Sequence, residues 1–308
     1  MVEYRTLAKD LVHIAILAAL VFAAVFLLTW TGVMKCSTIP GWCDPYYFLV
    51  RGGTPRILIV SGDAGMGNPD LLGQTLGNPE YAGVRPTQTN IELVNLGNLK
   101  QYDLVIVEKA RQVSTLKLKS FMDYVNQGGR LVWTGDAGTE LASGDELLLA
   151  NEVPDSDSNS TKALGPWARK EGQNIVPFHE FLGVQYRTSY CLIKACQGLQ
   201  WQGTLQTSAG RDHPLAYALR QGLVLRGDFA IVSDVSGSIT TRVLSLNWQS
   251  ELIGNDRVGY GKIFPVIVTS GYGERVAYYA VPPEQFVEDY QPEKYYSLVE
   301  NLYYGMLR

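Results

Sequence analysis

The sequence predicts an α/β protein: a mostly parallel sheet flanked by helices, preceded by one membrane-spanning helix at the amino terminus. The first observation behind this prediction is an uncharged apolar run over residues 11–33. The second is that short, β-branched apolar runs alternate with helical patterns between residues 56 and 135. Strands and helices that alternate in this way form parallel sheets with right-handed crossovers.

Composition narrows the class of protein further. Of the 308 residues, 46% are hydrophobic and 18% are charged, and the formal net charge is −4. This composition supplies a large apolar core and does not fit a disordered chain. The slightly acidic balance argues against nucleic acid as a partner.

Residues 11–33 are predicted to cross a lipid bilayer, which leaves residues 1–10 as a short cytoplasmic tail. The run contains no Asp, Glu, Lys or Arg. At about 1.5 Å per residue it is long enough for a hydrocarbon core of about 30 Å. Trp30, near its end, suits the membrane interface. The alternatives are a cleaved signal peptide, whose apolar region is usually shorter, and a buried core helix.

The cysteines predict the side of the membrane on which the rest of the chain lies. Cys36 and Cys43 form one close pair in the sequence, and Cys191 and Cys196 form another. An even number of closely spaced cysteines indicates two disulfides in an oxidising compartment. Asn159 begins an Asn-Ser-Thr glycosylation sequon, which agrees with that side. We therefore expect a single-pass protein of the cell membrane whose carboxyl-terminal domain lies outside the cytoplasm.

Residues 34–53 are predicted to form a juxtamembrane collar before a globular domain at 54–308. The collar carries a cysteine pair and the aromatic residues Trp42, Tyr46, Tyr47 and Phe48. Aromatic side chains so close to the span would rest on lipid headgroups or on a neighbouring helix.

The first half of the domain alternates strands and helices. Strands are predicted at 56–60, 91–96, 102–108 and 130–135, and helices at 68–77 and 114–129. The strands are predicted because apolar, β-branched runs end at turn residues. The second helix is amphipathic, with Ser114 as a capping residue and Gly128–Gly129 at its end.

The second half has more β-strand character. Residues 143–166 are polar and predict mostly loop. Strands are predicted within 222–235, 240–248 and 264–281, the last containing a hairpin at TSGYGER. Residues 292–307 have apolar residues at helical spacing and should pack on the sheet.

One short motif occurs twice, each time directly after a predicted strand. SGDAG covers residues 61–65 and TGDAG covers residues 134–138. Because the carboxyl ends of parallel strands lie at the same edge of a sheet, we expect Asp63, Glu108 and Asp136 at the edge where open α/β sheets bind ligands. Three carboxylates brought close together would require a proton or a divalent cation.

The same acidic residues have a purely structural interpretation. Each Asp would cap the next helix or bond to its own glycine turn. Glu108 would pair with Lys109 or Arg111. Both interpretations remain open on the sequence alone.

Two other candidate sites lack a residue that their motif requires, and the role of His213 stays open. The loop at 62–67 lacks the lysine of a phosphate-binding loop, because Asn68 stands at that position. Residues 155–160 begin like a calcium loop but lack its glycine at the sixth position. His213 would serve either as a catalytic base or as the residue that holds a turn before a helix begun by Pro214.

The order of these elements resembles the class I glutamine amidotransferase-like superfamily, which has a flavodoxin-like fold. The resemblance rests on LVWTGDAG at 131–138, on a helix followed by GGRLV, on the tripeptide His-Pro-Leu at 213–215, and on SGYGERVAYYAV before a final helix. It covers residues 54–308 and implies a membrane-anchored, non-catalytic branch. In the enzymes of the superfamily, the turn after the LVW strand carries a cysteine nucleophile.

This sequence lacks the residues that carry out the enzyme chemistry of that superfamily. The turn reads Asp136-Ala137, with no thiol or hydroxyl. His179 is followed directly by Glu180, which departs from the His-x-Glu spacing of the superfamily. We therefore expect no catalytic residues.

These observations predict a non-catalytic extracytoplasmic module for assembly or recognition in a membrane or cell-surface complex. Its expected partners are the bilayer and either an integral membrane protein or further copies of the chain. No cofactor is expected. The alternative is a hydrolase or transferase that uses the acidic edge at Asp63, Glu108 and Asp136, with a divalent cation.

Overall fold

A computed structural model describes most of the chain. The described residues are 2–31, 33–34, 36–39, 41–79, 81–153, 158–194, 203–208, 213–217, 219, 228–254, 257–286 and 292–307. The chain divides into two units, Met1–Pro55 and Arg56–Arg308.

The first unit consists of one long helix and a short helix tied to its end. Helix α1 spans Val2–Trp30, and its segment Asp10–Trp30 is long and apolar enough to cross a membrane. The most apolar window of that segment is not buried in the protein, so the alternative of a core helix is wrong. A 3₁₀ turn, η1 (Cys36–Thr38), leads into helix α2 (Cys43–Arg51). The predicted disulfide between Cys36 and Cys43 is confirmed.

The second unit is built on an eight-stranded sheet. Its spatial order is β2 (Thr87–Asn90), β1 (Ile57–Ser61), β3 (Leu104–Glu108), β4 (Arg130–Thr134), β13 (Val276–Tyr279), β12 (Ile263–Ser270), β11 (Thr240–Trp248) and β9 (Gly203–Thr207). The pairs from β2 to β13 are parallel, and those from β13 to β9 are antiparallel. The predicted α/β class with a mostly parallel sheet is confirmed.

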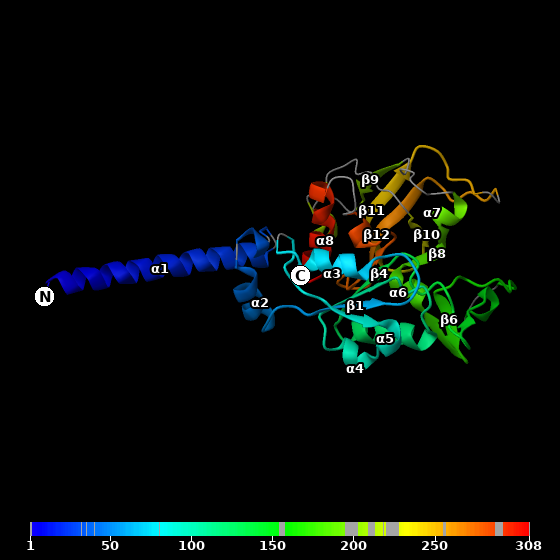
Figure 1. The fold of residues 1–308 in the computed structure, drawn as a ribbon, viewed down its shortest axis with the longest axis horizontal. Helices are drawn as coiled ribbons and strands as arrows, with labels where there is room; N and C mark the ends of the chain where they lie inside the picture. The colour runs from blue at the N-terminus through cyan, green and yellow to red at the C-terminus, as the bar shows by residue number, and fades with distance from the viewer. Residues whose placement is uncertain are drawn as a thin grey trace. The chain divides into compact units, whose positions relative to one another are not determined.

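Helices cover both faces of the parallel part of the sheet (Figure 1). Figure 1 shows α4 (Leu96–Leu99) and α5 (Thr115–Asn126) on one side of β1, and α3 (Pro69–Gly77) and α8 (Pro292–Met306) on the other. The strands carry buried residues on both faces, which is typical of parallel sheets between two helical layers. Ser114 caps α5 through its side chain, as predicted.

Two smaller sheets extend the domain. One consists of β5 (Glu146–Leu147), β6 (Ala168–Glu171) and β7 (Asn174–Pro177), and the other pairs β8 (Val184–Ser189) with β10 (Ala230–Asp234). The short helices between elements are η2 (Ile91–Leu93), η3 (Ala150–Glu152), α6 (Phe178–Leu182), α7 (Tyr190–Ile193), η4 (Pro214–Ala216) and η5 (Pro283–Phe286).

The prediction of a strand at 91–96 is wrong. The strand is β2, which ends at Asn90, and residues 91–93 form a 3₁₀ turn. Asn90 accepts a hydrogen bond from the backbone N–H of Glu92 at 2.9 Å, and Asn95 accepts one from Asn98 at 3.0 Å. Asparagine side chains that cap backbone N–H groups favour turns and helix starts over strands. The predicted hairpin within 264–281 is confirmed as β12 and β13, whereas 222–227 lies outside the described residues.

Candidate functional site

The two GDAG motifs meet at the carboxyl edge of the sheet, as predicted. The loop after β3 lies between them and bonds to both. Lys109 donates its backbone N–H to the Met66 carbonyl at 2.7 Å, and Arg111 donates to the Ala64 carbonyl at 2.8 Å. On the other side, Gly138 donates to the Ala110 carbonyl at 2.8 Å. The three loops therefore form one hydrogen-bonded layer.

Asp136 ties this layer together through its side chain. It is buried, and its Oδ1 accepts from the Met66 backbone N–H at 2.7 Å. Its Oδ2 accepts from Arg111 Nε, also at 2.7 Å. The hydrogen bond to Asp136 raises the pKa of Arg111. Both carboxylate oxygens thus stabilise neighbouring loops. Asp136 links these loops through its side chain rather than capping a helix.

Glu108 lies beneath this layer, next to a second buried glutamate. Both Glu108 and Glu284 are fully buried, and no described N–H or O–H group donates to the Glu108 carboxyl. Burial first, and then the charge of Glu284, raise the pKa of Glu108 well above its ordinary value. Glu284 Oε1 accepts from the backbone N–H of Asn68, the N-cap of α3, at 2.7 Å. Glu108 therefore favours its protonated form beside Glu284.

The sequence did not indicate this pairing. The expectation that Glu108 pairs with Lys109 or Arg111 is wrong, since no described group donates to the Glu108 carboxyl and Arg111 is bonded to Asp136. Gly67, at φ +120°, makes room for the glutamate, because a Cβ there would lie 3.1 Å from Glu108 Oε2.

The three acidic residues do not converge on one site. Asp63 is exposed, Glu108 is enclosed with Glu284, and Asp136 is bonded to Met66 and Arg111. Among the described residues, no group of three or more His, Cys, Asp or Glu side chains is arranged to hold a metal ion.

The turn after β4 is part of the hydrophobic core. Ala137 is fully buried, and its carbonyl accepts hydrogen bonds from the indole N–H groups of Trp133 at 2.9 Å and Trp167 at 2.8 Å. Trp133 also packs edge-on against Phe121 and Phe178. Aromatic side chains therefore enclose the turn that follows β4.

A buried arginine, Arg169 on β6, holds the loops around this turn from the other side. Its guanidinium donates to the carbonyls of Val113, Gly138 (2.6 Å) and Glu140 (3.1 Å). It also donates to Asp145 Oδ2 at 2.9 Å, an oxygen that accepts from the Thr115 N–H at the start of α5 as well. Burial lowers the pKa of Arg169, and the Asp145 charge opposes this shift. Sequence reasoning missed Arg169, because nothing in ARKE distinguishes a buried arginine from a surface one.

His213 has the structural role of a residue that holds a turn, rather than a free ring that could act as a base. Its Nδ1 accepts from the Leu215 backbone N–H at 3.2 Å, which caps the turn η4. Its Nε2 lies 2.9 Å from Glu274 Oε2. Both ring nitrogens are thus occupied. His179 is buried on α6, where burial lowers its pKa and keeps the ring neutral.

The remaining predicted residues are placed as follows. Cys191 is disulfide-bonded, and its predicted partner Cys196 lies outside the described residues. Asn159 is exposed in a loop, as a glycosylation acceptor must be. Residues 155–157 of the calcium-like stretch lie outside the described residues.

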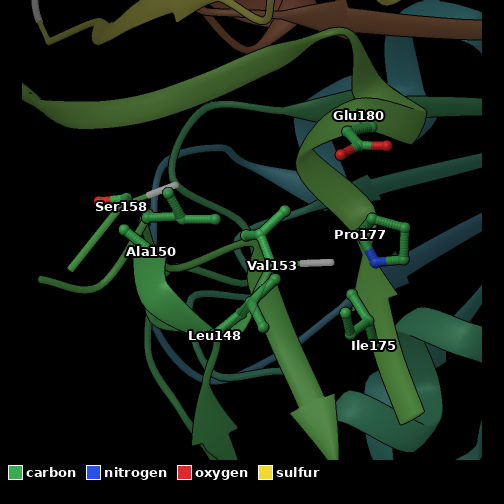
Figure 2. Close-up of a pocket in the computed structure, with 8 residues that line it drawn as sticks. Leu148, Ala150, Val153, Ser158, Ile175, Pro177 and Glu180 are labelled. Atoms are coloured by element: carbon green, nitrogen blue, oxygen red, sulfur yellow. The ribbon is translucent and has the colours of Figure 1, made fainter. Parts of the chain in front are cut away.

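A pocket of about 480 Å³ lies beside the three-stranded sheet (Figure 2). Its lining residues are Leu148, Ala150, Val153, Ser158, Leu164, Ile175, Pro177 and Glu180. Figure 2 shows Val153 facing Ile175 and Pro177, with the Glu180 carboxylate at one end. The walls are mostly apolar.

Comparison with known proteins supports the fold. No protein-family model matches the sequence, and no curated protein matches it. A ThuA-like protein from Bacteroides uniformis is 16% identical, with a TM-score of 0.52 over 82% of this chain and 91% of that one. PurLQS from Thermotoga maritima is 12% identical, with a TM-score of 0.41 over 82% of this chain and 99% of that one, a likeness too weak to carry an argument.

The likeness to the ThuA-like protein bears on the fold alone. It agrees with the α/β architecture described above.

Proposed function

We propose that this chain is a single-pass membrane protein whose α/β domain is a catalytically silent module for assembly or recognition. The main observation behind the proposal is the position of Ala137. It occupies the turn where the enzymes of this superfamily hold their nucleophile, and two tryptophans hold its carbonyl inside the core. Acyl transfer needs an accessible thiol or hydroxyl at such a position, and none is available.

Helix α1 supports a membrane location. Its apolar segment has 21 residues, enough for one crossing. The disulfide Cys36–Cys43, directly after this segment, supports a domain on the oxidising side, since such bonds are rare in the cytoplasm. The exposed Asn159 is consistent with the same side.

Exposed leucines on the domain supply a candidate contact surface. Lys117 Nζ donates to the carbonyls of Glu92 and Val94, both at 2.6 Å, which brings the starts of α5 and η2 side by side. Leu93 is 67% exposed and Leu116 is 60% exposed. We call these two residues the Leu93–Leu116 patch. We propose that these two exposed leucines belong to the contact surface.

The test is the particle mass of the full-length protein in mild detergent, with and without the patch. The wild type is expected to form particles that contain more than one chain, or one chain with an integral membrane partner. Leu93→Glu with Leu116→Glu should reduce these particles to single chains. Leu192→Glu is the matched control, because Leu192 is 76% exposed elsewhere on the domain. A wild type that remains a single chain without partners at every concentration would contradict the proposal.

A further inference from the structure

Helix α2 folds back onto the carboxyl-terminal turns of α1. The ring of Trp42 packs edge-on against Phe22, with centroids 5.1 Å apart, and Tyr46 packs against Phe26 at 5.9 Å. Trp42 Nε1 also donates to Thr29 Oγ1 at 2.9 Å. These contacts join the first turn of α2 to one face of the apolar span rather than to the polar surface beyond it.

These contacts set the depth in the membrane at which α2 begins. Phe26 and Phe22 precede Trp30 by four and eight residues, which correspond to about 6 and about 12 Å along a helix. Amphipathic helices that lie in a membrane surface are immersed by about 5–10 Å at the boundary of headgroups and acyl chains. With Trp30 at the interface, α2 therefore starts at the depth of such a helix. Figure 1 shows α2 running across the axis of α1 rather than along it, which is the direction of a helix in the membrane plane.

The outward face of α2 is apolar. Phe48 is 68% exposed and Leu49 is 55% exposed, and Pro45 lies between them on the same arc. The opposite face, with Tyr47, is buried. Asp44 stands at the edge of the apolar arc, where a headgroup layer would meet it. Phenylalanine and leucine exposed together on so short a helix would be unfavourable in water.

Several described residues of the turn between the helices donate to backbone carbonyls within the same unit. Thr31 and Met34 donate to the carbonyls of Leu27 and Leu28, and Trp42 donates to Ile39. The Cys36–Cys43 disulfide closes the same turn. Internal hydrogen bonding of this kind is required of irregular backbone near the hydrocarbon region.

We infer that α2 is a second membrane element, an amphipathic helix that lies in the leaflet at the carboxyl end of α1 with Phe48 and Leu49 in the lipid. The inference rests on the proposed membrane span of α1. If α2 lies in the leaflet, the linker that begins at Gly52 leaves the membrane surface at the end of a helical hairpin. It does not leave at the end of a single span.

The test is photo-crosslinking of the full-length protein in phosphatidylcholine vesicles. Benzoylphenylalanine replaces Phe48, Leu49 or Leu17, one position at a time, and lipid adducts are read by mass spectrometry of peptides. All three side chains are exposed in the structure, so the substitutions leave the packing of the hairpin intact. The intact Cys36–Cys43 peptide in non-reducing conditions verifies the fold of each variant.

Lipid adducts at positions 48 and 49, with yields comparable to that at position 17, are expected. Adducts at 17 together with crosslinks from 48 and 49 only to protein would overturn the inference and leave the span in place. The protein crosslinked would then identify the occupant of this face as a second copy or as the α/β domain. An absence of lipid adducts at all three positions would overturn both the inference and the proposed span.

Discussion

Asp63 and Asp136 occupy the same position in two copies of one motif, yet their surroundings differ completely. Asp136 is buried and bonded on both oxygens, whereas Asp63 is exposed. The sequence correctly placed both at one edge of the sheet. It could not reveal which of the two is buried, because that depends on Arg111 and Met66 from the neighbouring loops.

The first prediction compares these two aspartates. Asp136→Ala removes hydrogen bonds to a charged acceptor, each of which contributes about 1.5–3 kcal/mol, so the unfolding free energy should fall by at least about 1.5 kcal/mol. Asp63→Ala should leave it unchanged within error. Chemical denaturation of both variants measures the difference. Equal losses would mean that the loop layer is not held by Asp136.

The second prediction concerns the pH dependence that Glu108 produces. Its folded pKa is raised above the ordinary value of 4.5. The stability that its neutral form contributes is therefore present below about pH 4.5 and is lost as the pH rises through the raised pKa. Glu108→Gln keeps the group neutral, so its melting temperature should exceed that of the wild type increasingly as the pH rises.

Melting curves from pH 5 to pH 9 provide the measurement. Glu251→Gln, at an exposed carboxyl, is the control and should follow the wild type throughout. A difference between Glu108→Gln and the wild type that stays constant with pH would contradict the assignment of a proton to Glu108.

At the scale of elements, strands of β-branched residues were predictable and short polar strands were not. RILIV, YDLVIVE and RLVWTG predicted β1, β3 and β4, because continuous apolar runs are typical of a sheet covered on both faces. The strands β6 (ARKE) and β8 (VQYRTS) lack such a run and were missed. Helix α2 was missed because its apolar residues Phe48 and Leu49 are exposed, while its contacts with α1 come from Trp42 and Tyr46.

The third prediction tests how β6 is joined to the parallel sheet. Arg169→Leu removes a fully buried guanidinium and leaves the partly buried Asp145 without its charge partner and several carbonyls without a donor. Removal of one partner from a buried pair costs about 3–5 kcal/mol, and we expect a loss of this size in the unfolding free energy. Lys170→Leu, the next residue, loses only surface ion pairs and should leave stability nearly unchanged. If the two variants melt alike, Arg169 does not join these elements.

At the scale of the whole molecule, the first unit is expected to determine where the protein is found. The full-length chain should fractionate with membranes and require detergent for extraction, because the apolar segment of α1 is exposed in the protein. Residues 56–308 alone, which form a separate unit, should be soluble. Recovery of the full-length protein in the soluble fraction without detergent would rule out the membrane span.

The apolar amino-terminal helix and the α/β class were readable from the sequence, and the role of the turn after β4 was readable only in part. The sequence showed that a nucleophile is missing at Ala137. It did not show that Trp167, thirty residues away, donates to the same carbonyl as Trp133. Contacts between distant segments depend on the tertiary fold and leave no local pattern.

Catalytic turnover by the purified full-length protein in mild detergent is the most direct measurement of the central claim. Glutamine hydrolysis and hydrolase activity with added divalent cations are assayed for the wild type, for Ala137→Cys and for Asp136→Asn. We predict no turnover by any of them, and a cysteine at position 137 that stays unreactive toward alkylating reagents while the protein is folded, because Ala137 is fully buried. Turnover by the wild type that Asp136→Asn abolishes without a change in melting temperature would contradict the account and identify the acidic edge as an active site.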